Sequence, residues 1–88
     1  MNYKSQGEEL RKQCKNLVYN FMLNNYNCQP LADGLRQSEI FRNCGLDWGN
    51  KENATSSNQQ YWIVAILRDL EEEQKIQRDP LNLKWRLK

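Results

Sequence analysis

The side chains best suited to chemistry in this chain are the amide, hydroxyl and basic groups on one face of a helix predicted at 58–74. At about 100° per residue, the polar side of this helix carries Asn58, Tyr61, Ala65, Arg68, Asp69 and Glu72. The opposite side carries an apolar stripe of Ile63, Ile66, Leu67 and Leu70, flanked by Gln59 and Gln74. Beyond it, from Leu83 to Lys88, apolar and basic residues alternate with the two-residue period of a strand. A polar helix face followed by a basic hairpin indicates binding to nucleic acid.

Catalytic chemistry has little basis in the sequence. There is no histidine, no glycine-rich phosphate loop and no nucleophile beside a recognisable base. The consecutive carboxylates of Glu71–Glu73 point about 100° apart on a helix, so they do not form a paired acid site. We therefore expect a protein that is not an enzyme.

The three cysteines, Cys14, Cys28 and Cys44, have no CxxC spacing and no histidine to complete a zinc site. We expect no metal and no cofactor. An odd number of thiols without a signal peptide favours reduced cysteines in the cytoplasm. No run of about 18 apolar residues is present, so no membrane span is expected.

The 88 residues suffice for one small domain, predicted to span 1–88, and the formal net charge is only +2. That total is too small to imply nucleic-acid binding by itself. The distribution is more informative, because basic residues outnumber acidic ones in 1–24 and 75–88, whereas acidic residues outnumber basic ones in 25–74. If the two ends of the chain meet on one face, they form a basic patch.

A first helix is predicted at about 5–24, where Ser5 and Glu8 have the form of a capping box. A short strand is predicted at about 29–31, since the residue before Pro30 favours extended geometry. A second helix is predicted at about 37–45, capped near Gln37 or Ser38 and ended by Gly45, after which Leu46 turns back to the core. Along the first helix, the apolar residues on one face are Leu10, Cys14, Leu17, Val18 and Phe21, widened by Tyr19, Met22 and Leu23.

A polar surface loop is predicted at 47–57, with Ser56 or Ser57 capping the long helix at about 58–74. A hairpin is predicted at 76–88, with a strand at 76–78, a turn at 79–82 and a second strand from Leu83. The expected class is α+β, mainly α with a small β-hairpin, in the order helix, strand, helix, helix, strand, strand.

This order, with SEIFRNCGL at 38–46 and LRDLEEEQKIQR at 67–78, resembles a winged helix-turn-helix domain. The resemblance covers nearly the whole chain, and its most specific part is the junction from Leu67 to Arg78. It implies three helices, with 38–45 as the second helix, 58–74 as the recognition helix and 76–87 as the wing. The chain departs from compact members of the family by the inserted loop at 47–57.

The resemblance implies that the start of the recognition helix enters a major groove of double-stranded DNA and that the wing touches the backbone. Amide side chains such as Asn58 and Gln60 can contact adenine edges, whereas basic residues neutralise phosphates. The candidate DNA-binding residues are Lys51, Ser57, Asn58, Gln60, Tyr61, Arg68, Arg78, Lys84, Arg86 and Lys88.

Each signal also has an ordinary structural explanation. The alternation of Trp85 with Leu83 and Leu87 favours a core tryptophan over a base-stacking one. Lys84 and Arg86 also fit the solvated side of an edge strand.

The DNA-binding hypothesis suggests transcriptional regulation or DNA recognition for a larger system. It also suggests a homodimer through the first helix, at Tyr19, Met22 and Leu23. The alternative is a protein-interaction or assembly module on the same fold, anchored by Trp48, Tyr61 and Trp62.

Overall fold

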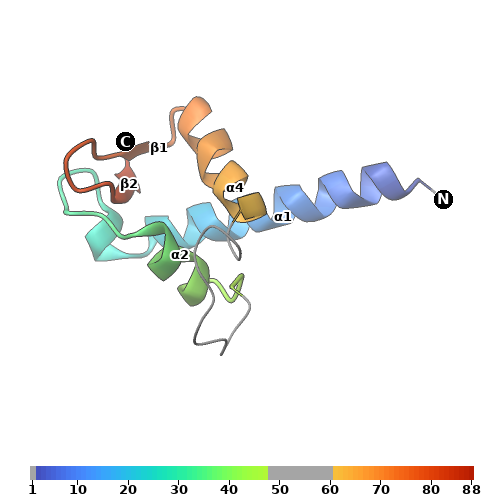
Figure 1. Cartoon of the computed structure of the whole chain (residues 1–88), viewed down its shortest axis with the longest axis horizontal. Helices are drawn as coiled ribbons and strands as arrows, with labels where there is room; N and C mark the ends of the chain where they lie inside the picture. The colour runs from blue at the N-terminus through green and yellow to red at the C-terminus, as the bar shows by residue number, and fades with distance from the viewer. Residues whose placement is uncertain (1, 48–60) are drawn as a thin grey trace.

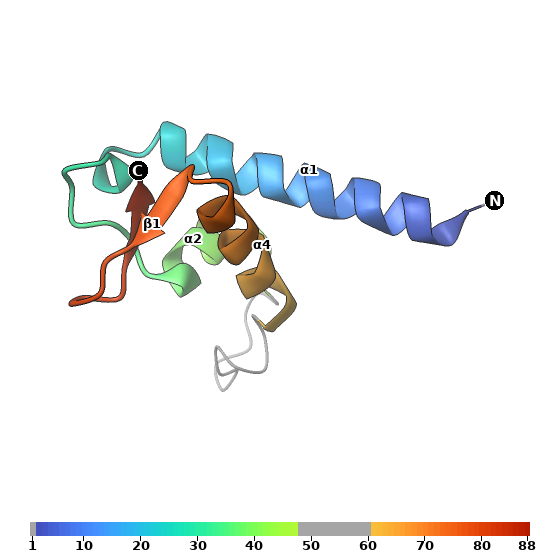
Figure 2. The same cartoon turned by 90° about the horizontal axis from the view of Figure 1, so that it is seen from above.

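The computed structural model describes residues 2–47 and 61–88. It is mainly helical with a two-stranded antiparallel sheet, which confirms the predicted α+β class (Figure 1). The long helix α1 crosses α4, and the hairpin lies beside the C-terminal end of α1 (Figures 1 and 2). The elements are α1 (Tyr3–Leu23), the 3₁₀ helix η1 (Tyr26–Cys28), α2 (Gln37–Asn43), α4 (Tyr61–Glu72), β1 (Ile76–Arg78) and β2 (Trp85–Leu87).

Helix α1 begins two residues before the predicted start. Asn2 is its N-cap, and the Asn2 side chain accepts a hydrogen bond from the backbone N–H of Ser5 at 3.1 Å. The predicted capping box at Ser5 is therefore wrong, because Ser5 already lies within the first turn. In the C-terminal half of α1, the side chains of Val18 and Met22 are fully buried in the core. Met22 is therefore not available for the predicted dimer surface.

The strand predicted at 29–31 is wrong. The chain forms η1 instead, since the Asn25 side chain accepts from the N–H of Asn27 at 2.9 Å and so caps a tight turn. Extended pairing comes later, at Leu35, which exchanges backbone hydrogen bonds of 2.9 and 2.8 Å with Trp85 of β2. Leu35 and β1 therefore pair with opposite edges of β2.

Gly34 permits this pairing. Its φ is +87°, and a Cβ at this position would lie 2.6 Å from the carbonyl oxygen of Trp85. Both the backbone conformation and the close approach of the Trp85 carbonyl therefore require glycine.

Replacing Gly34 with alanine is expected to lower the free energy of unfolding by about 3 kcal/mol, because left-handed strain adds to a steric clash. Gly45→Ala is the matched control, since Gly45 also has a positive φ, of +70°, but no atom of the described residues lies within 4 Å of its Cβ position. The control should lose about 1 kcal/mol, the strain alone. Urea denaturation measures both values, and equal losses would contradict the role given to the Trp85 carbonyl.

Helix α2 begins at Gln37 as predicted but ends at Asn43, two residues before the predicted end. Arg36 is the N-cap in place of Gln37 or Ser38, and its N–H donates to the Glu39 carboxylate at 3.2 Å. Gly45 adopts the left-handed conformation after the helix, as predicted. The N–H of Leu46 then donates to the carbonyl of Phe41 at 2.9 Å, which turns Leu46 back against the core.

Helix α4 buries Ile66, Leu67 and Leu70, as the apolar stripe predicted, and exposes Arg68. It ends at Glu72 rather than Gln74, because Gln74 has a φ of +62° and Lys75 N–H bonds to the Leu70 carbonyl at 3.0 Å. The predicted start of this helix at 58–60, its caps and nearly all of the predicted loop lie outside the described residues.

The hairpin pairs Ile76 with Leu87 and Arg78 with Trp85. Its turn is longer than predicted, because the Asp79 side chain accepts from the N–H groups of both Leu81 and Asn82. The second strand consequently starts at Trp85.

Leu83, predicted to face the core, has a φ of +62° and is 54% exposed. Trp85 and Leu87 are buried, as predicted. The hydrophobic core consists of Val18, Met22, Cys28, Ile40, Phe41, Ile66, Leu67, Leu70, Ile76, Trp85 and Leu87.

Candidate nucleic-acid interface

Trp85 brings together one arginine of α4 and one of the hairpin. The guanidinium carbon of Arg68 lies 5.6 Å from the centroid of the Trp85 ring, and that of Arg78 lies at the same distance. The strand register explains the second contact, since Arg78 pairs directly with Trp85 across the hairpin. Both distances are within the range of cation–π attraction, so a buried indole supports two positive charges from different elements.

The two guanidinium groups have further partners. Arg68 forms an ion pair of 3.3 Å with Glu71, one helical turn away, and about half of its side chain is exposed. Such an exposed pair stabilises little and is readily exchanged for another anion. The Nε of Arg78 donates to the carbonyl of Leu83 at 3.3 Å, which fixes its side chain along the hairpin. Arg78 is therefore a cation in a fixed position, whereas Arg68 is free to exchange Glu71 for another anion.

Arg86 lies on the other side of the hairpin. It pairs with Gln77 across the strands, and alternation turns both away from the face of Trp85. Its Nη1 donates to the Asp79 carboxylate at 2.8 Å, and only 20% of each side chain is exposed. A polar pocket of about 270 Å³ adjoins this ion pair. The structure thus separates Arg86 from Arg68 and Arg78 and engages it in an internal ion pair.

The Arg86 hydrogen bond holds the pKa of the Asp79 carboxyl below its ordinary value, assisted by the backbone N–H groups of Leu81 and Asn82. A carboxyl with a lowered folded-state pKa stabilises the fold above its unfolded pKa, and this stabilisation is lost as the pH falls through the folded pKa.

We expect the melting temperature to fall as the pH drops below about 4, the ordinary range of aspartate. Asp79→Asn should make that fall shallower, as measured by circular dichroism melts across acidic pH. Arg86→Gln removes the main hydrogen bond that lowers the Asp79 pKa, so it should also make the acid-induced fall of the melting temperature shallower. An unchanged acid profile in both variants would contradict the assignment to this ion pair.

Two lysines complete the candidate DNA-binding residues that the structure describes in the hairpin region. Lys84 is half-buried, and its backbone N–H bonds to the Asn82 side chain at 2.8 Å. Lys88 is exposed, and its N–H bonds to the carbonyl of Lys75 at 3.2 Å. Tyr61 is the first residue of α4. The other candidates, Lys51, Ser57, Asn58 and Gln60, lie outside the described part of the chain.

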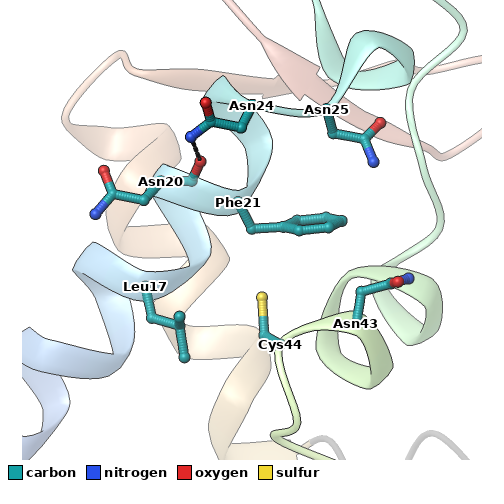
Figure 3. Close-up of a pocket in the computed structure, with 7 residues that line it drawn as sticks. All are labelled: Leu17, Asn20, Phe21, Asn24, Asn25, Asn43 and Cys44. Atoms are coloured by element: carbon teal, nitrogen blue, oxygen red, sulfur yellow. Dashed lines mark hydrogen bonds between the residues drawn. The ribbon is translucent and has the colours of Figure 1, made fainter.

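A second pocket, of about 300 Å³, lies between the C-terminal half of α1 and the end of α2 (Figure 3). Leu17 and Phe21 of α1 and Cys44, the C-cap of α2, form its apolar part. Burial raises the pKa of the Cys44 thiol to about 11, so the thiol is protonated at neutral pH and is a poor nucleophile. The polar residues that line the pocket are Asn20, Asn24, Asn25 and Asn43.

Within the described residues 2–47 and 61–88, neither a metal-binding group nor a membrane-spanning helix is present. These ranges contain no group of three or more acidic, cysteine or histidine side chains placed to hold a metal ion. Within the same ranges, every helix is too short or too polar to cross a membrane.

The sequence did not reveal the role of Trp85 as a support for two arginines. Alternation assigned Trp85 to the core, and helical periodicity assigned Arg68 to the outer face of α4. Their contact depends on how α4 packs against the hairpin, which neither pattern specifies. No protein-family model, curated protein or solved structure matches the chain.

Proposed function

We propose that this protein is a non-enzymatic DNA-binding module with a winged helix-turn-helix arrangement. The observation that carries the proposal is the contact of Arg68 and Arg78 with Trp85, which joins cations of α4 and the hairpin. Arginine is well suited to phosphate recognition because its planar group donates several hydrogen bonds. Two linked arginines would bind the DNA backbone beside a groove occupied by the start of α4.

The pairing of Leu35 with β2 supports the winged arrangement. In this interpretation, Leu35 and the hairpin form the small sheet, α4 serves as the recognition helix, and β1, β2 and their turn form the wing. The proposed DNA-binding residues are then Arg68, Arg78, Lys84 and Lys88, together with the candidates at 51–61. We exclude Arg86 from the proposed DNA-binding residues, because its guanidinium forms an ion pair with Asp79 in the hairpin turn.

The biological role that follows is transcriptional regulation, or DNA recognition for a larger system. We further propose a reducing, cytoplasmic setting, because Cys14, Cys28 and Cys44 are all free thiols.

A protein-interaction module is the second candidate. The apolar pocket at Leu17, Phe21 and Cys44 favours it, as does the low net charge of +2. A protein partner would use shape and apolar contacts, and its binding would depend little on salt.

The test is binding of the purified protein to random-sequence duplex DNA, followed by fluorescence anisotropy across salt from about 50 to 200 mM. Binding that weakens steeply with salt supports the DNA-binding function, because counterions are released from the phosphates. No binding at the lowest salt would overturn it and favour the protein-interaction module.

A further inference from the structure

The N-terminal half of α1 packs against nothing in the described part of the chain. Every residue from Tyr3 to Gln13 is exposed, and the helix extends well beyond the rest of the fold (Figures 1 and 2). This free half nevertheless carries large apolar side chains, with Tyr3 77% and Leu10 62% exposed. Exposed apolar side chains aligned on one face of a free helix mark a candidate interaction surface.

The apolar residues follow a heptad pattern. Tyr3, Leu10 and Leu17 are spaced seven residues apart. A second series with the same spacing consists of Gly7, Cys14 and Phe21, and Gly7 and Cys14 lie three residues before Leu10 and Leu17. These are the a and d positions of a coiled coil. The stripe runs from the free half of α1 to the pocket formed by Leu17, Phe21 and Cys44 (Figure 3).

We propose that a second copy of this chain covers the stripe, with the two α1 helices antiparallel. A twofold axis near Lys12 places Tyr3 opposite Phe21 of the second copy, Gly7 opposite Leu17 and Leu10 opposite Cys14. Each of these residue pairs then places an a position of one helix opposite a d position of the other. This proposal does not rest on the DNA-binding function.

The pocket fits Tyr3 in this arrangement. A helical side chain leans toward the N-terminus of its own helix. In an antiparallel pair, Tyr3 therefore leans toward the C-terminal end of the other α1, where the pocket lies. The ring would meet Leu17 and Phe21, and the surrounding asparagines offer partners for its hydroxyl. Only the antiparallel orientation lets each free half cover the pocket of the other copy.

Gly7 supports a close approach at the same surface. Glycine inside a helix is destabilising relative to alanine, yet no atom of residues 2–47 or 61–88 lies within 4 Å of the Gly7 Cβ position. Among the residues that the structure describes, no neighbour within the same copy requires this position to be small. In the proposed pair it leaves room for Leu17 of the second copy.

The charges are also complementary. Lys4 and Arg11 project from the same side of α1 as Lys15, which forms an ion pair with Glu73 at the end of α4. In the antiparallel pair, this basic side of one free half runs along the acidic end of α4 in the other copy. The three acidic residues at that end are Glu71, Glu72 and Glu73.

Sedimentation velocity across micromolar concentrations tests the proposal, with a dimer expected for the wild-type chain. Leu10→Glu should raise the dimer dissociation constant by about 100-fold or more, because two carboxylates enter the apolar seam. Leu81→Glu is the matched control, since Leu81 is 93% exposed on the hairpin turn and should leave the dimer unchanged. A monomeric wild-type chain, or a dimer that tolerates Leu10→Glu, would overturn the proposal.

The thiol of Cys44 tests the position of Tyr3. Alkylation of Cys44, followed by mass spectrometry, should slow as the wild-type concentration rises, because Tyr3 of the second copy covers the pocket. Tyr3→Ala should return Cys44 alkylation to the rate of the dilute, monomeric wild-type chain, at concentrations where the variant is still dimeric. Equal Cys44 alkylation in monomer and dimer would contradict the antiparallel register.

Discussion

Replacing Arg68 and Arg78 together with glutamine is expected to weaken DNA binding by about 10- to 100-fold at low salt. Each phosphate contact contributes about 0.9 to the slope of log affinity against log salt. The double variant should therefore bind with a slope shallower by about 2. Glutamine keeps much of the apolar stem over Trp85, so loss of the two cation–π contacts costs only about 1 to 2 kcal/mol of stability.

Lys12→Gln is the matched control for this variant. Lys12 is exposed on the free half of α1, which packs against nothing in the described part of the chain, so the change removes a positive charge without touching Trp85 or its two arginines. Its salt slope should equal that of the wild-type protein. If both variants bind DNA like the wild type, the site does not lie over Trp85.

Trp85→Ala is expected to lower the free energy of unfolding by about 3 to 5 kcal/mol. Trp85 is fully buried, pairs with Arg78 and Leu35, and packs within the main hydrophobic core. Alanine would leave a large cavity where α4 meets the sheet. Small domains have total stabilities of about 5 to 15 kcal/mol, so the variant would be marginally folded.

Urea denaturation followed by circular dichroism measures this effect. Trp85→Phe is the comparison, because it keeps an aromatic ring and removes the indole Nε1, which is buried without a hydrogen-bond partner among the described residues. Trp85→Phe should retain more than half of the stability that Trp85→Ala loses. A loss below about 1 kcal/mol for Trp85→Ala would contradict the central place of this residue.

Periodicity predicted the parts of the fold that depend on which face is buried. The helical stripe identified Ile66, Leu67 and Leu70 as core residues, and alternation identified Trp85 and Leu87. Glycine chemistry also identified the end of α2, because Gly45 adopts a left-handed conformation. These features follow from local rules, which act within a few residues.

The predicted element boundaries were wrong where a single side chain forms hydrogen bonds with the backbone that the sequence pattern does not specify. Asn2 supplies a cap that precedes the predicted capping box, and Asp79 accepts two backbone hydrogen bonds that lengthen the hairpin turn. Leu35 pairs with Trp85 fifty residues later, so no local pattern could have located that contact.

The candidate site was predicted only in part. Charge selected Arg68, Arg78 and Arg86 alike, because each is a basic residue in the predicted recognition helix or the predicted wing. The ion pair between Arg86 and Asp79 depends on the turn geometry, and the contact of Arg68 with Trp85 depends on how α4 packs. Sequence patterns therefore identified the residues but not their grouping.

The most direct test of the DNA-binding surface is a titration of the ¹⁵N-labelled protein with duplex DNA, followed by two-dimensional nuclear magnetic resonance. We expect the largest shifts for the backbone amides and side-chain N–H groups of Arg68, Arg78 and Trp85, with little change at Arg86 and on the free half of α1. No shifts, or shifts centred on Leu10 and Leu17 without Arg68 and Arg78, would contradict it.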